Sequence, residues 1–146
     1  MVANGPIVEI QLWVSRSLQE VLRKKGQSIP DPVKVTAMID TGASGTVVNP
    51  SVIQALGIQP VGVTAIKTPS TTAPVLCHQY ELAVLFPNNV VIDSCIAVEA
   101  PLQGQHIKCL IGRNILAHGV LIYTGYTNYF HIEFLIVVML WLIAQI

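Results

Sequence analysis

The sequence of 146 residues predicts one domain of the all-β class. Near the N-terminus, apolar residues alternate with more polar ones, as they do in a strand that buries one face. The apolar positions are Val8, Ile10, Leu12 and Val14, and the residues between them are Glu9, Gln11 and Trp13. Further apolar runs of strand length follow, and turn-forming segments separate them.

The remaining strands are expected where such apolar runs lie between turns. They cover residues 33–39, 46–48, 61–67, 75–86, 90–98, 120–123 and 129–133, and residues 108–112 form an apolar approach to a glycine. Residues 61–67 and 75–86 are expected to form a long hairpin, because the segment 68–74 that joins them is polar and bounded by proline.

Two short helices are expected, over residues 50–56 and 113–118, and a glycine follows each of them. Pro50 suits the first turn of a helix, where its missing N–H costs nothing. Residues 17–25 form either a short helix or one arm of a hairpin. The segment 26–32 opens with a glycine and holds two prolines, so it is expected to be a loop.

The composition argues against several classes of function. The formal net charge is zero, and Arg23–Lys25 is the only basic cluster, so no nucleic-acid partner is expected. Three cysteines without close pairing favour a reducing compartment, the cytoplasm, over a disulfide framework. The four histidines are scattered without the spacing of metal ligands, and we expect neither a metal nor a cofactor.

The most informative motif is Asp40-Thr41-Gly42, directly after the expected strand 33–39. Hydrolysis of a peptide by carboxylates needs two of them at one water molecule, and two such groups roughly 3 Å apart share one proton. One then acts as a general base on the water, and the other polarises the scissile carbonyl. The motif occurs once, so the second carboxylate would be Asp40 of a two-fold-related chain.

Two segments together resemble the retropepsin-like aspartic proteases, the single-domain, homodimeric relatives of pepsin. Met38–Ser44 looks like the active-site loop of that family, and Leu110–Leu116 looks like its second signature. The resemblance covers about Pro6 to Phe134. It implies a closed β-barrel with a flap hairpin and one short C-terminal helix, a homodimer, a polypeptide substrate, and a protease domain over residues 1–134.

In the loop, the resemblance assigns a role to each residue. Asp40 would be the catalytic acid and base. Thr41 would lock the two active-site loops of the dimer together, and Gly42 would exchange backbone hydrogen bonds with the substrate. Ala43 belongs to the small residues that keep the floor of the cleft low.

In the second signature, Gly112 would let the segment pack beneath the catalytic loop, and Asn114 stands where relatives carry Asp or Asn. Arg113 would anchor the helix. In retroviral members it does so by pairing with an acidic residue four positions after the catalytic Asp. This chain has Ser44 at that position, so the partner of Arg113 is missing.

The resemblance places the flap at the tip of the hairpin, with Thr68, Pro69 and Ser70 as its residues. A flap closes over an extended peptide and adds main-chain hydrogen bonds to it. The tip is not rich in glycine, unlike that of retroviral enzymes. The candidate walls of an apolar cleft are Val47, Ile66, Val75 and Ile111.

The chain ends in an apolar run, FLIVVMLWLIAQI, over residues 134–146. As a helix it would span about 20 Å, less than the ~30 Å of a bilayer core. Three interpretations of the tail 135–146 stay open: a membrane-associated segment, an extra strand or helix buried in a dimer, and a non-native or exposed extension.

The sequence therefore predicts an aspartic-type endopeptidase, located in the cytoplasm or associated with a membrane through residues 134–146. Two alternatives remain. The first is a non-catalytic dimerisation or peptide-binding module of the same fold, and the second is a membrane-tethered scaffold with an incidental Asp40 loop.

Overall fold

The computed structural model describes residues 5–67, 72–102 and 106–134, and in these ranges the chain is mostly β. The strands are β1 Ile7–Val14, β2 Val33–Ile39, β3 Thr46–Val48, β4 Gly62–Ile66, β5 Val75–Phe86, β6 Val90–Glu99, β7 Cys109–Ile111, β8 Gly119–Thr124 and β9 Tyr129–Phe134. The helices are α1 Arg16–Lys24, α2 Pro50–Leu56, α3 Arg113–Leu116 and a 3₁₀ turn at Pro87–Asn89. The all-β prediction is confirmed.

Six strands close into a barrel in the order β1-β2-β7-β3-β6-β5. Closure comes from the pairing of β1 with β5, in which Gln11 to Val14 lie antiparallel to Leu85 to Leu82. The β2–β7 and β3–β6 pairs are parallel, and the other pairs in the sheet are antiparallel. The closed barrel predicted from the sequence is therefore confirmed.

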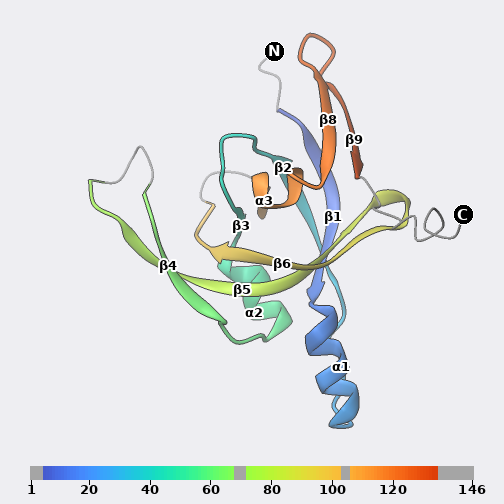
Figure 1. The fold of residues 1–146 in the computed structure, drawn as a ribbon, viewed down its shortest axis with the longest axis vertical. Helices are drawn as coiled ribbons and strands as arrows, with labels where there is room; N and C mark the ends of the chain where they lie inside the picture. The colour runs from blue at the N-terminus through green and yellow to red at the C-terminus, as the bar shows by residue number, and fades with distance from the viewer. Residues whose placement is uncertain (1–4, 68–71, 103–105, 135–146) are drawn as a thin grey trace, which may run out of the picture.

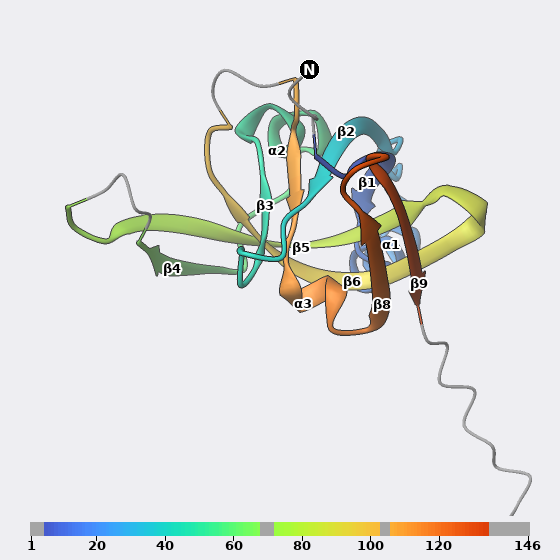
Figure 2. The ribbon, with the colours of Figure 1, turned by 90° about the horizontal axis from the view of Figure 1, so that it is seen from above.

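Strand β5 is long enough to belong to two structures. Its second half forms a wall of the barrel against β1 and β6. Its first half, Val75–Gln79, pairs with β4 and extends away from the barrel as a hairpin (Figure 1 and Figure 2). The expected flap residues Thr68, Pro69 and Ser70 lie outside the described residues.

The core follows from the alternation seen in the sequence. In β1, Ile10, Leu12 and Val14 are buried, whereas Glu9 and Gln11 are exposed. Alternation aligns the apolar faces of the barrel strands, and full burial of such a side chain contributes about 1.5–3 kcal/mol. The core also includes the buried face of α2, which is formed by Val52, Ile53 and Leu56.

Two predicted helices follow their local capping signals. Of the two alternatives for residues 17–25, the helix is correct: the Ser15 hydroxyl accepts a hydrogen bond from Leu18 N at 3.3 Å and starts α1. Asn49 caps α2 in the same way through Ser51 N, and Gly57 ends it with φ of 63°.

The prediction for the last helix is wrong at its C-terminal end. Helix α3 stops at Leu116 instead of continuing to His118, and Gly119 begins β8 rather than capping the helix. A Cβ at Gly119 would lie 2.5 Å from the carbonyl oxygen of Glu133, so the close approach of β8 and β9 requires glycine here. This contact is between strands and leaves no local signal.

The β8–β9 pair forms a separate two-stranded sheet beside the barrel (Figure 1). Its inner residues pack against the core, and the rings of Phe86 and Phe134 lie 4.9 Å apart. Within the described ranges, no helix combines the length and apolar character needed to cross a membrane. The apolar tail 135–146 lies outside those ranges, so its three interpretations stay open.

Candidate active site

Asp40 lies at the end of β2, where the two sequence signatures meet. Strand β2 pairs in parallel with β7, so that Ile39 is opposite Ile111. The next backbone N–H, that of Asp40, donates to the carbonyl oxygen of Ile111 at 3.0 Å. Segments about 70 residues apart in the chain thus lie together at Asp40.

The carboxylate of Asp40 is oriented by its own loop. Its Oδ1 accepts hydrogen bonds from the backbone N–H of Gly42 at 2.9 Å and of Ala43 at 3.3 Å. Hydrogen bonds of this kind fix the direction of the carboxylate. A Cβ on Gly42 would lie 3.1 Å from Oδ1, which is tight, so glycine leaves room for the carboxylate. Thr41 is exposed beside it.

Gly112 packs directly under this loop. A Cβ at Gly112 would lie 2.2 Å from the carbonyl oxygen of Gly45, a separation that no side chain tolerates. The neighbouring N–H of Arg113 donates to the carbonyl oxygen of Ala43 at 2.9 Å. The second signature therefore supports the loop through backbone contact, as the resemblance implies for Gly112.

Arg113 has a partner other than the acidic residue found in retroviral members. Its Nη1 donates to the carbonyl oxygen of Thr41 at 3.2 Å. Ser44 stands where those relatives carry the acid, and the backbone carbonyl takes its place as acceptor. Arg113 is exposed, so solvent screens this contact and its contribution is small. The side chain still ties α3 to the active-site loop.

Thr46 is a site residue that the sequence did not reveal. Its hydroxyl is fully buried, donates to Asn114 Oδ1 at 2.9 Å and accepts from Gly112 N at 3.2 Å. Asn114 in turn donates through Nδ2 to the carbonyl oxygen of Ile96 at 3.0 Å. One feature of the sequence could have pointed to Thr46: it is a threonine in the expected strand 46–48, beside two valines. A hydroxyl that is buried in such a strand needs a hydrogen-bond partner.

A cleft of about 730 Å³ lies beside Asp40. Among the described residues that line it are Val47 and Ile66, as expected. Ile111, also expected there, is instead buried in the core, and its neighbour Leu110 lines the cleft. Adjacent residues in a strand point to opposite faces, which accounts for the exchange. The expected wall residue Val75 is exposed and is not part of the described lining.

Burial disfavours the thiolate form of two of the three cysteines, Cys95 and Cys109. Burial, with a smaller contribution from the charge of Glu81, raises the pKa of Cys95 to about 12. Burial likewise raises the pKa of Cys109 above its usual range. A thiol must ionise to act as a nucleophile. In the described part of the chain, no three His, Cys, Asp or Glu residues are grouped to hold a metal.

The chemistry of the cleft therefore rests on a carboxylate. Asp40 is the only acidic side chain among the described residues that line it. This arrangement, a loop-held aspartate beside a cleft in a closed barrel, is typical of aspartic proteases. Residues 27–115, more than half of the chain, match the family model for aspartyl proteases, and the chain belongs to that family. The resemblance inferred from the two signatures is confirmed.

Solved structures of low sequence identity are also similar. One is the solution structure of the simian foamy virus (mac) protease, with a TM-score of 0.48 and 16% identity over 76% of this chain and 91% of that one. Another is the EIAV protease in complex with the inhibitor HBY-793, with a TM-score of 0.49 and 16% identity over 80% and 88% of the two chains. The comparison with curated proteins found no match.

The contact of Gly112 with Gly45 leads to a first prediction. Gly112→Ala is expected to lower the free energy of unfolding by at least about 2 kcal/mol, because the new methyl group meets a backbone oxygen that has no room to move. Urea denaturation measures this loss. Gly45→Ala is the matched control, since a Cβ at Gly45 has no atom within 4 Å. Equal stability of the two variants would contradict the close contact.

The Thr46 hydroxyl leads to a second prediction. Thr46→Val keeps the shape of the side chain but leaves the buried N–H of Gly112 without its acceptor, and we expect a loss of about 1–3 kcal/mol in unfolding free energy. Thr46→Ser retains the hydroxyl and is the control, with a smaller loss from the missing methyl group. If the valine variant is as stable as the serine variant, the hydrogen bonds of Thr46 do not hold the loop.

Proposed function

We propose that the chain is an aspartic endopeptidase whose active site is completed by Asp40 of a second copy. The observation that carries the proposal is the single carboxylate beside the described part of the cleft. Peptide hydrolysis by this chemistry needs a second carboxyl group. A two-fold axis through the active-site loop would supply it, because an isologous contact repeats the same residue on both sides.

The roles of the two carboxyl groups follow from their shared proton. The ionised Asp40 takes a proton from water as the water oxygen bonds to the scissile carbonyl carbon, while the protonated Asp40 donates a hydrogen bond to the carbonyl oxygen. The C–N bond then breaks, and a proton from the pair passes to the leaving nitrogen. The N–H groups of Gly42 and Ala43 hold the carboxylate in position throughout.

The proposed substrate is an extended polypeptide lying between the active-site loop and the β4–β5 hairpin. Val47, Ile66 and Leu110 offer apolar walls for its side chains. Thr68, Pro69 and Ser70 remain the proposed flap tip. Two expectations rest on composition alone: the location in the cytoplasm, and the contact of the tail 135–146 with a membrane.

Asp40→Asn tests the catalytic role. The amide keeps the size of the side chain and an oxygen for the loop N–H groups but cannot act as the base, so we expect cleavage of an unfolded protein to fall by about 10²- to 10⁴-fold. The wild type should also lose activity at both low and high pH, because one carboxyl group must be protonated and the other ionised.

Asp93→Asn is the matched control, because this exposed aspartate pairs with Arg16 and does not line the cleft. Equal cleavage by the wild type and Asp40→Asn would refute the proposal that the chain is an aspartic endopeptidase that acts through Asp40. If neither cleaves but both bind the unfolded substrate, the chain is a peptide-binding module of the same fold.

A mixing experiment tests the shared dyad. Wild type at fixed concentration is mixed with a ninefold excess of Asp40→Asn, and random pairing is expected to reduce cleavage to about one-tenth, because mixed dimers carry one intact carboxyl group. An excess of Asp93→Asn should not reduce cleavage. Activity that stays proportional to wild-type concentration, whatever the excess of Asp40→Asn, would rule out a site built from two chains.

A further inference from the structure

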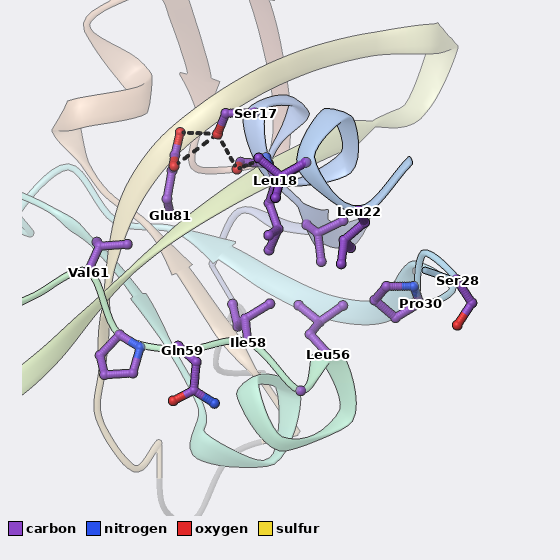
Figure 3. A pocket seen from close by; sticks show the side chains of 15 residues that line it. Ser17, Leu18, Leu22, Ser28, Pro30, Leu56, Ile58, Gln59, Val61 and Glu81 are labelled. Carbon is purple, nitrogen blue, oxygen red and sulfur yellow. Dashed lines mark hydrogen bonds between the residues drawn. The ribbon is translucent and has the colours of Figure 1, made fainter. Parts of the chain in front are cut away.

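A second hollow, which we call the α1 hollow, lies between helix α1 and the connection from α2 to β4 (Figure 3). Its volume is about 620 Å³, within the range of ligand sites, and it shares no lining residue with the Asp40 cleft. Leu18 and Leu22 of α1 point toward Ile58 and Leu56 on the opposite wall. The body of the hollow is therefore apolar.

One end of the α1 hollow carries a fixed carboxylate, that of Glu81 on β5 (Figure 3). The hydroxyl of Ser17 donates to its Oε2 at 3.2 Å and to its Oε1 at 3.3 Å. The hydroxyl of Ser94 donates to Oε1 at 2.7 Å. An ionised carboxylate accepts about four hydrogen bonds. The two hydroxyls therefore orient Glu81 and leave it able to accept further hydrogen bonds from a ligand.

The charge of Glu81 has no cation beside it among the described residues. Of the residues that the structure describes, it is the only one with a charged side chain in the lining of the hollow. Arg16 of α1 pairs instead with Glu20 at 3.6 Å and with Asp93 at 3.5 Å. An apolar trough that ends in an oriented, half-buried anion is complementary to an apolar ligand that ends in a cation.

We propose that the α1 hollow binds a polypeptide segment in which a lysine or arginine lies next to apolar side chains. The apolar side chains occupy the space between α1 and Ile58, and the cation bonds to Glu81. The exposed Ser28 and Gln59 at the rim offer polar groups to the backbone of such a segment. The site is separate from the proposed proteolysis and does not depend on it.

The α1 hollow adjoins the base of the flap hairpin. Val61 lines the hollow, and its N–H donates to the carbonyl oxygen of Gln79 at 2.8 Å. Gln79 lines the Asp40 cleft, and Glu81 lies two residues further along β5. A segment bound in the hollow would thus contact β5 and Val61, the residue directly before β4.

The test measures binding of a fluorescent, end-blocked peptide, Leu-Val-Leu-Lys, to the full chain carrying Asp40→Asn, so that the peptide is not cleaved. A second peptide has norleucine in place of lysine. The lysine peptide should bind about tenfold more tightly, since a hydrogen bond to a charged group is lost with norleucine. This preference should disappear with Glu81→Gln and persist with Asp93→Asn.

Val21 provides an independent variant, because it lines the hollow and is 44% exposed, so a change there leaves the core intact. Val21→Ser should weaken both peptides alike. Equal affinity of the two peptides for the parent chain would overturn the proposal. A lysine preference that survives Glu81→Gln would also overturn it, because the lysine would then bind elsewhere. The absence of saturable binding up to about 1 mM peptide would overturn it as well. The comparison of peptides stands even if Glu81→Gln does not fold.

Discussion

The backbone contact between Gly112 and Gly45 is the constraint on which the active site depends. Only a residue without a Cβ lets the two segments approach so closely. Backbone hydrogen bonds lie on both sides of it, from Asp40 N to Ile111 O and from Arg113 N to Ala43 O. The position of the Asp40 loop is therefore determined mainly by the main chain of β7 and α3.

These main-chain contacts hold the loop although Ser44 stands where retroviral members of the family carry the acidic partner of Arg113. The guanidinium reaches the carbonyl oxygen of Thr41 instead. Because that contact is exposed, the buried hydroxyl of Thr46 takes the greater part in joining Gly112 and Asn114 to the loop. The weaker contact of Arg113 with Thr41 at the surface is thus combined with the stronger, buried hydrogen bonds of Thr46.

Strand β5 links the parts of the molecule that lie outside this loop. It closes the barrel against β1, supplies one arm of the flap hairpin, and carries Glu81 at the end of the α1 hollow. A single strand of 12 residues can do this because its first four residues, Val75–His78, pair with β4 and not with β6, whereas Gln79 pairs with both strands. The Asp40 cleft and the α1 hollow are consequently neighbours along one strand.

The sequence by itself determined the strands, the caps of α2 and the placement of Asp40 after β2, because these features depend on residues a few positions apart. Alternation and capping act locally. Only the tertiary structure decided that Thr46 joins Asn114, that α3 ends early so that Gly119 can approach Glu133, and that Glu81 ends an apolar hollow. These contacts join distant segments, and their partners exist only after the barrel has closed.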